Sequence, residues 1–232
     1  MSNVGVKKSL WVDCQASALL VIDMQRDFCS PHGYAARAGL DVARLAGPIG
    51  QIRRLLDAAR GAGLLVVHTR EGHLPDLSDC PLEKMQRSQQ AGAPIGSAGP
   101  MGRLLVRGEH GHDFIDELQP VAGEAVIDKP GYGAFYQTAL AQLLLDRAIC
   151  QLIICGVTTE VCVHSTLREA VDRGYACITV ADATAASDPA LQVPALAMIG
   201  VEGGIFGRVA TTEQLLAALC SVSHSKDSKE LP

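Results

Sequence analysis

The sequence predicts an α/β fold in which helices cover both faces of a six-stranded, mostly parallel sheet. Short apolar runs alternate along the chain with helix-like segments. This alternation is typical of βαβ units, which build parallel sheets with helices on both sides. Apolar residues make up 48% of the 232 residues and charged residues 19%, which suits a large buried core. We expect one domain over residues 1–220 and a polar, flexible tail over 221–232.

Each predicted element has its own signal in the chain. Apolar runs such as ALLVID and CQLIICGV predict buried strands, and glycines after helix-like spacing mark helix ends. The predicted strands, in order, are 18–23, 64–69, 124–129, 150–157, 175–182 and 207–212. The predicted helices are 44–63, 139–148, 160–174, 189–200 with a possible kink at Pro194, and 213–220.

Residues 70–123 fall outside this pattern, because they are rich in glycine, proline and charge. A loop of this length in a compact domain is usually functional. We expect it to close over an active site or to pack on a neighbouring subunit.

Composition excludes several classes of protein. The net charge of −5 brings no basic excess, so neither a nucleic-acid partner nor an anionic membrane surface is expected. No apolar run approaches the roughly 18 residues of a membrane-spanning helix, and the N-terminus lacks a signal-peptide pattern. The 8 cysteines are scattered without a CxxC pair, which favours free thiols and a cytoplasmic protein.

Ligands in parallel α/β sheets bind beyond the carboxyl ends of the strands. Asp23 and Lys129 end two predicted strands, and Cys162 follows a third through the tight turn GVTTE. Cys162 also lies just inside a predicted helix N-terminus, where backbone N–H groups favour a thiolate and an oxyanion. His164 is a poor base for this thiol, since residues two apart on a helix do not face each other. Taken one at a time, each of these residues has another interpretation. Cys162 could be a packed core cysteine, Lys129 a surface lysine, and Asp23 a carboxylate that is paired for structural reasons.

A metal or cofactor site has little support in the sequence. Glu71 and His73 offer two ligands from one loop, but a catalytic metal usually needs a third, and nothing ties His110 or His112 to that loop. The stretch GYGAFY at 131–136 lacks the third glycine and the acidic partner of a dinucleotide site. We therefore expect neither a metal nor another cofactor.

Three stretches together resemble the isochorismatase-like cysteine hydrolases: LLVIDMQRDF, DKPGYGAF and GVTTEVCVHSTLREAVDRGY. The resemblance covers roughly residues 16–220 and implies a Rossmann-like three-layer sandwich with an Asp23–Lys129–Cys162 triad. It also implies an oxyanion hole from the N–H groups of Thr158 and Cys162, next to a cis peptide between Val157 and Thr158. Family members are commonly oligomeric, so a homo-oligomer, of which a tetramer is the expected form, is implied as well.

Within that family the sequence looks like the biuret hydrolase branch, with two departures. That branch has lysine where this chain has Tyr132 and glutamine where it has Glu202. A carboxylate at position 202 would accept hydrogen bonds from N–H groups. This favours a longer linear ureide such as triuret, which offers an additional –NH–CO–NH2 group. Phe28, Arg70, Tyr132 and Glu202 are the expected substrate contacts. One alternative substrate is biuret. Another is a ureidoacrylate or N-carbamoyl compound, and Arg70 or Arg87 would then face its carboxylate.

The implied reaction is hydrolysis of a terminal carbamoyl group. Cys162 would attack the carbonyl, Asp23 would carry the proton to the departing ammonia, and Lys129 would keep Asp23 ionised. A non-catalytic binding domain is the alternative from another class. The presence of all three triad residues argues against it.

Overall fold

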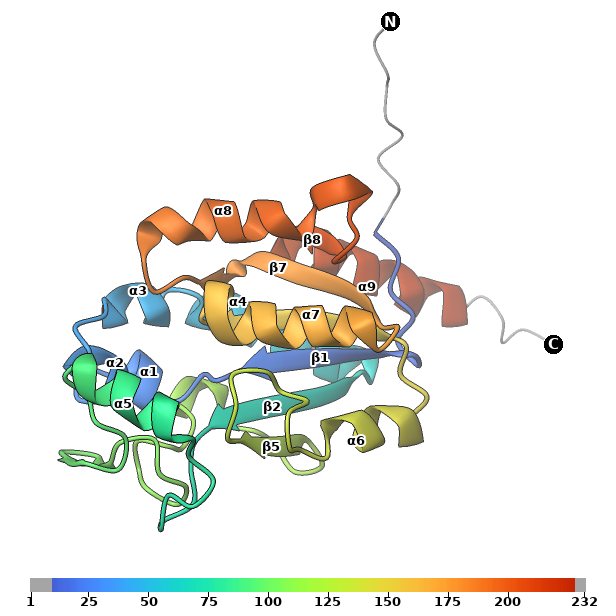
Figure 1. The fold of residues 1–232 in the computed structure, drawn as a ribbon. Coiled ribbons are helices and arrows are strands. Elements are labelled where there is room, and N and C mark those ends of the chain that lie inside the picture. The colour runs from blue at the N-terminus through green and yellow to red at the C-terminus, as the bar shows by residue number, and fades with distance from the viewer. Residues whose placement is uncertain (1–9, 228–232) are drawn as a thin grey trace, which may run out of the picture.

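The computed structural model describes residues 10–227, and its centre is a six-stranded sheet in the order β5-β2-β1-β6-β7-β8 (Figure 1). Every neighbouring pair of strands is parallel, which confirms the predicted α/β class and makes this sheet entirely parallel. All six predicted strands are present, with ends shifted by a few residues. Their bounds are β1 Ser17–Ile22, β2 Leu65–Glu71, β5 Ala125–Lys129, β6 Gln151–Val157, β7 Ala176–Ala185 and β8 Arg208–Ala210.

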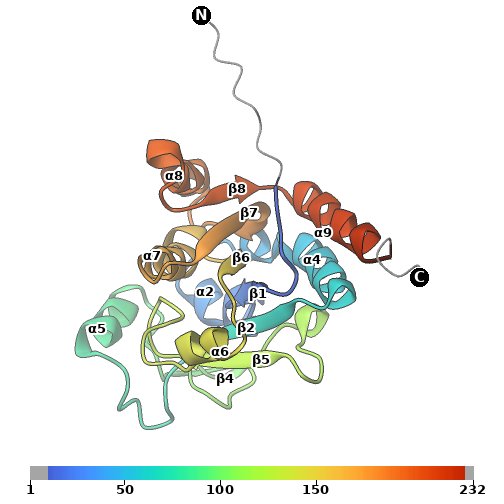
Figure 2. The same ribbon diagram turned by 90° about the vertical axis from the view of Figure 1, so that its right-hand side faces the viewer.

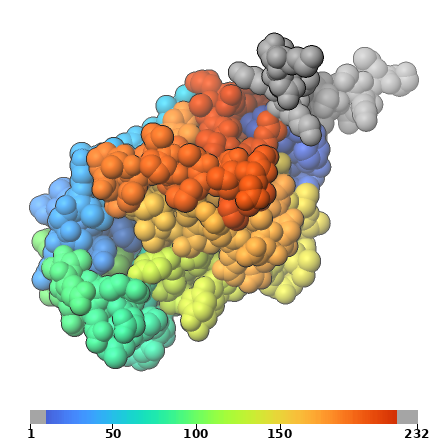
Figure 3. All heavy atoms as spheres, turned by 45° about the horizontal axis from the view of Figure 1, so that its top comes forward, coloured from blue at the N-terminus to red at the C-terminus, as the bar shows by residue number. Residues whose placement is uncertain are grey.

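Helices cover both faces of the sheet, so the fold has three layers (Figure 2). Helices α4 (Ile49–Ala62) and α9 (Thr212–Asp227) lie on one face. Helices α6 (Leu140–Asp146), α7 (His164–Asp172) and α8 (Pro189–Ile199) lie on the other. In the space-filling view α8 forms an orange band across its side of the molecule (Figure 3).

Strand β1 shows why the chain folds this way. Its side chains are all buried, and they alternate between two cores. Leu19 and Val21 pack in the core beneath α4 and α9, whereas Leu20 and Ile22 pack in the core beneath α6 and α7. Successive strand residues point to opposite faces, so a continuous apolar run is required when both faces are covered.

The predicted helix 44–63 is two helices in the structure. A short helix α3 (Val42–Ala46) ends at Gly47, and α4 begins after Pro48. Proline lacks the N–H group that would continue the first helix, but its fixed φ suits the start of the second. The predicted stop is confirmed, since Gly63 ends α4 with φ of 72°.

The region 70–123 contains regular structure that the sequence prediction missed. It holds the helix α5 (Leu82–Gln90), the two-stranded hairpin of β3 (Ala98–Gly99) and β4 (Gly102–Arg103), and a 3-10 turn η1 (Asp116–Leu118). Pro81 before the helix and Glu83 in its first turn are ordinary helix-start signals. The buried Asp27 anchors this region, because its carboxylate accepts a hydrogen bond from Leu105 N at 2.9 Å.

The first part of the predicted tail 221–232 is helical. Helix α9 continues to Asp227, and residues 228–232 lie outside the described part of the chain. Within residues 10–227 no helix is long and apolar enough to cross a membrane. Among the described cysteines, the following carry free thiols, as predicted: Cys29, Cys80, Cys150, Cys155, Cys162 and Cys177.

Gly156 allows a test of how closely strand β6 packs against the backbone of β1. Its φ is +109°, and a Cβ there would lie 2.1 Å from the carbonyl oxygen of Ile22. Gly156→Ala is therefore expected to lower the free energy of unfolding by at least about 2 kcal/mol, from backbone strain and overpacking. Urea unfolding measures this. Gly61→Ala in α4 is the control, since open space surrounds that position and alanine there should stabilise by up to about 1 kcal/mol. Equal effects of the two substitutions would contradict the packing described for β6.

Candidate active site

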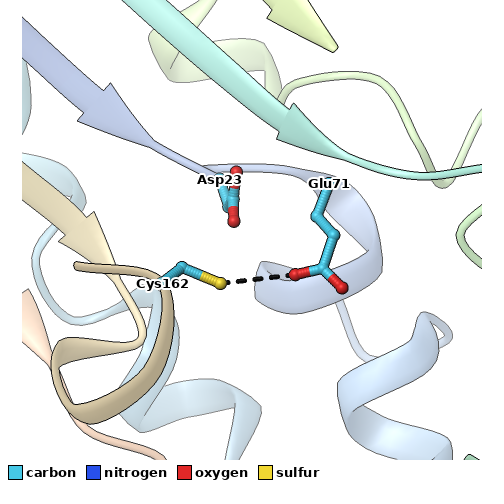
Figure 4. A group of neighbouring side chains, drawn as sticks. All are labelled: Asp23, Glu71 and Cys162. Carbon is cyan, nitrogen blue, oxygen red and sulfur yellow. Dashed lines mark hydrogen bonds between the residues drawn. The ribbon is translucent and has the colours of Figure 1, made fainter. Parts of the chain in front are cut away.

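Three residues predicted from strand ends meet at one place in the structure. Asp23 follows β1 directly, Lys129 ends β5, and Cys162 follows β6. The order of the sheet reverses between β1 and β6, which is where parallel sheets open a crevice for ligands. Nζ of Lys129 lies 2.8 Å from Oδ2 of Asp23, and both side chains are fully buried. Figure 4 shows the Asp23 and Cys162 side chains facing each other.

The turn after β6 carries the cysteine. The Val157–Thr158 peptide bond is cis, as the family resemblance implied. A π-helical turn η2 (Thr159–Val163) follows and runs directly into α7, so the predicted helix over 160–174 is present with a wider first turn. The first N–H groups of such a turn have no partner within the helix. Cys162 lies in this turn, and the oxyanion hole expected from its N–H group stays a prediction.

His164 points away from the cysteine. Its Nε2 lies 2.8 Å from the carbonyl oxygen of Ala195 in α8. This contact confirms that the histidine is a packing residue and not a base for Cys162.

A second buried carboxylate lies beside the thiol. Sγ of Cys162 donates a hydrogen bond to Oε2 of Glu71 at 3.3 Å (Figure 4). Nζ of Lys84, from α5, lies 2.6 Å from Oε1 of the same carboxylate, and Nζ of Lys129 lies 3.6 Å from Oε2. From the sequence, Glu71 is expected only as a metal ligand, and Lys84 is not expected at the site because no predicted element carries it.

Burial and charge set the protonation of these groups in opposite directions. Burial raises the pKa of Asp23, against the attraction of Lys129. Burial alone would also raise the pKa of Glu71, but Lys84 and Lys129 outweigh it and bring that pKa to about 2. Burial raises the pKa of the Cys162 thiol, with Lys129 opposing and Asp23 and Glu71 adding to the rise. These directions favour an ionised Glu71 and a neutral thiol.

Cys162 opens into a cavity of about 290 Å³ that suits a small molecule. Phe28 and Tyr132, both predicted to contact substrate, line this cavity, as does Thr158. Two cationic side chains from α5, Lys84 and Arg87, also line it. The cavity thus combines aromatic and cationic side chains with the thiol.

The prediction that Arg70 lines the pocket is wrong. Neighbouring residues of a strand point to opposite faces, and the pairing of β2 with β5 sets Arg70 beside Asp128 and Glu71 beside Lys129. Nε of Arg70 lies 2.7 Å from Oδ1 of Asp128, and its guanidinium stacks over Phe114. Glu71 is therefore the residue of β2 that reaches the site.

Glu202, the other predicted substrate contact, does not line the cavity of its own chain. Glu202 is exposed in the turn η3 (Val201–Gly203), which lies between α8 and β8. A segment that leads into a parallel strand lies at the amino ends of the sheet, on the opposite side from Cys162. The residues lining the cavity near Cys162 do not include it.

One group of three side chains in the described region has metal-ligating atoms close together. The atoms of Asp23, Glu71 and Cys162 lie within 4.8 Å of one another. The ammonium groups of Lys129 and Lys84 already lie at these carboxylates. His73, the other proposed ligand, instead contacts Asp79, with Nδ1 at 3.2 Å from Oδ1. A site that works without metal stays a prediction.

Comparison with known proteins agrees with this geometry. Residues 17–214 match the model of the isochorismatase domain. The chain is 38% identical over 213 residues to the ureidoacrylate amidohydrolase RutB of Methylorubrum extorquens, covering 90% of this chain and 85% of the relative. It is 37% identical over 178 residues to RutB of Serratia proteamaculans, covering 75% and 72%.

Solved structures give the same result. A cysteine hydrolase from Pseudomonas syringae superposes with a TM-score of 0.77 at 29% identity, covering 92% of this chain and 97% of that one. The N-carbamoylsarcosine amidase of Thermoplasma acidophilum superposes with a TM-score of 0.65 at 28% identity, covering 85% and 96%. The narrower resemblance to biuret hydrolases stays a prediction. The chain belongs to the isochorismatase family, and it is an amidohydrolase that acts on carbon–nitrogen bonds.

Proposed function

We propose that this enzyme hydrolyses the carbamoyl group of a small ureido acid of the ureidoacrylate type. The main support is Arg87, which lines the cavity of Cys162 and forms no ion pair among residues 10–227. Lys84 beside it is already paired with Glu71. An unpaired guanidinium at the mouth of a small cavity suits a carboxylate, which it can bind through two hydrogen bonds.

The names of the relatives support the same substrate class. The curated relatives are named for ureidoacrylate, and one structural neighbour is named for N-carbamoylsarcosine. Both molecules carry a terminal carbamoyl group on nitrogen and a carboxylate at the other end. A cavity of about 290 Å³ has room for a molecule of this size.

In the proposed mechanism Cys162 is the nucleophile. Asp23 accepts the thiol proton as sulfur attacks the carbamoyl carbon, and the N–H groups of Thr158 and Cys162 stabilise the oxyanion. Asp23 then gives the proton to the terminal nitrogen, and ammonia leaves as the carbon–nitrogen bond breaks. Lys129, 2.8 Å from Asp23, compensates the buried carboxylate so that it can act as a base.

Hydrolysis of the acyl-enzyme completes the cycle. Asp23 activates a water molecule, which attacks the thioester-like carbonyl, and the proton returns to sulfur. The product is a carbamate of the substrate amine, which loses carbon dioxide to leave the free amine. A urea-type carbonyl is a weak electrophile because both nitrogens donate into it, so a thiolate with oxyanion stabilisation is needed.

Triuret, the substrate favoured by the sequence, loses its support in this structure. The argument for it depended on Glu202, which lies at the other end of the sheet. Triuret and biuret also lack a carboxylate for Arg87. Ammonia release from ureidoacrylate, N-carbamoylsarcosine, biuret and triuret tests the proposal directly. We expect the highest kcat/KM with a ureido acid, and a preference for biuret or triuret would overturn the proposal.

Arg87→Gln is expected to separate substrates by charge. Loss of a charge-assisted pair costs about 1.5–3 kcal/mol, so kcat/KM for ureidoacrylate should fall by roughly tenfold to a hundredfold. Turnover of biuret, which has no carboxylate, should change little. The control is Arg53→Gln, which removes the same charge from the exposed face of α4. Equal losses on both substrates would contradict a carboxylate-binding role for Arg87.

A further inference from the structure

We propose that Glu71 is a specificity-determining residue that holds the Cys162 thiol at rest and gives up this contact to the terminal NH2 group of the substrate. The inference rests on the proposed function for its substrate, a carbamoyl compound. It assigns Glu71 a role outside the Asp23–Lys129–Cys162 triad. It also predicts that the nucleophile becomes more reactive when the substrate binds.

The two oxygens of Glu71 have different surroundings. Oε1 faces Nζ of Lys84 at 2.6 Å, and Lys84 also donates to the carbonyl oxygen of Pro130 at 2.8 Å. Oε2 faces Sγ of Cys162 at 3.3 Å and Nζ of Lys129 at 3.6 Å, and Glu71 is one of the residues lining the cavity. Lys84 therefore fixes the carboxylate through Oε1, while Oε2 is the oxygen on the side of the thiol.

An ionised carboxylate accepts hydrogen bonds and donates none. A carbamoyl NH2 group next to the carbon under attack can donate to Oε2 in place of the thiol. An ester oxygen or a carboxylate at that position offers only acceptors, so it would leave two acceptors facing each other in a buried site. Such an unpaired arrangement discriminates strongly. Glu71 thus selects a terminal amide nitrogen at the reacting carbon.

The same charge controls the thiol. The charged groups that face Cys162 come from the carboxyl ends of three neighbouring strands: Asp23 follows β1, Glu71 ends β2 and Lys129 ends β5. Oε2 of Glu71 lies 3.3 Å from Sγ, so the negative charge of Glu71, together with that of Asp23, raises the pKa of the thiol. Arg87, Tyr34 and Tyr132 line the same cavity, and Lys84 acts through Glu71. A carboxylate at hydrogen-bond distance disfavours the thiolate form of Cys162. When the NH2 group of the substrate donates a hydrogen bond to that carboxylate, this effect becomes weaker.

The test compares thiol reactivity in wild type, Glu71→Gln and Glu71→Asp. Methyl methanethiosulfonate, a small neutral reagent, reports the thiolate fraction of Cys162 as a function of pH. Glu71→Gln should lower the apparent thiol pKa by at least about one unit and react about tenfold faster near neutral pH. Glu71→Asp keeps the charge but places it farther from the sulfur, so its apparent thiol pKa should lie between those of wild type and Glu71→Gln. Cys162→Ser provides the background from the other cysteines.

Glu83→Gln is the matched control, since it removes the same charge from an exposed position on α5, next to Lys84. Its thiol profile and its activity should match wild type. In the same preparations Glu71→Gln should lose at least about a hundredfold in kcat/KM for a ureide but keep its activity on p-nitrophenyl acetate, which has no N–H group. A Glu71→Gln thiol as slow as wild type, or equal losses on ureide and ester, would overturn the inference.

The reactivity measurement separates this inference from the proposed function, because it needs no substrate. If no ureido acid is turned over but the thiol pKa falls in Glu71→Gln, the proposed substrate is wrong and the restraint of the thiol by Glu71 stands. If ureido acids are turned over and the thiol pKa does not fall, the restraint is wrong and the proposed function stands.

Discussion

Cys162→Ser is expected to lower kcat for ureide hydrolysis by at least about a thousandfold, while the fold is kept. A serine hydroxyl at this position is a much weaker nucleophile than a thiol, because the site offers a carboxylate base and no histidine partner. The side chain is almost fully buried, and serine is of nearly the same size, so the packing around it should survive. Ammonia release at saturating substrate measures the effect, and circular dichroism checks the fold.

Cys150→Ser is the matched control for that experiment. Cys150 is exposed directly before β6, at the amino end of the sheet, and should tolerate the change with full activity. Similar activity of Cys162→Ser and wild type would remove the assignment of the nucleophile.

Lys129→Met is expected to have the largest effect on stability. It would leave Asp23 buried without the ammonium group that now lies 2.8 Å from its carboxylate. Removing one partner of a buried ion pair costs about 3–5 kcal/mol. Lys129 also donates hydrogen bonds to the carbonyl oxygens of Gly131 and Tyr132, which would lose their donor. Urea unfolding should show this loss together with the loss of activity.

Two further variants make this prediction specific. Arg173→Met breaks the exposed pair with Glu169 on α7, which should cost only about 0.3–0.5 kcal/mol. The double variant Asp23→Asn with Lys129→Met removes both charges and should recover part of the stability that Lys129→Met loses, although it stays inactive. A Lys129→Met protein as stable as the Arg173→Met protein would contradict the description of a buried pair.

The sequence was sufficient for the sheet and for three residues of the site. Parallel strands buried on both faces appear as continuous apolar runs, and β1 and β6 are such runs. Asp23, Lys129 and Cys162 could be placed together because the carboxyl ends of parallel strands share one edge. These inferences need only local patterns and one topological rule.

Other parts of the site depended on information that local patterns do not carry. Arg70 and Glu71 are neighbours, and only the register of β2 against β5 decides which of them faces the cavity. Lys84 contacts Glu71 from α5, and this helix lies in a region in which the sequence predicts none. Glu202 was assigned through a resemblance, although its place before β8 puts it at the amino ends of the strands. A homotetramer and a single domain over 1–220 stay predictions.

The central claim is that a covalent acyl group forms on Cys162 during hydrolysis. Rapid acid quenching of the enzyme during turnover of ureidoacrylate, followed by peptide mass spectrometry, tests this claim most directly. If ammonia leaves first, the peptide containing Cys162 should gain about 113 Da, the mass of the substrate less ammonia. The same peptide should stay unmodified in Asp23→Asn. Rapid turnover with no adduct on Cys162, or an adduct on another residue, would contradict the account.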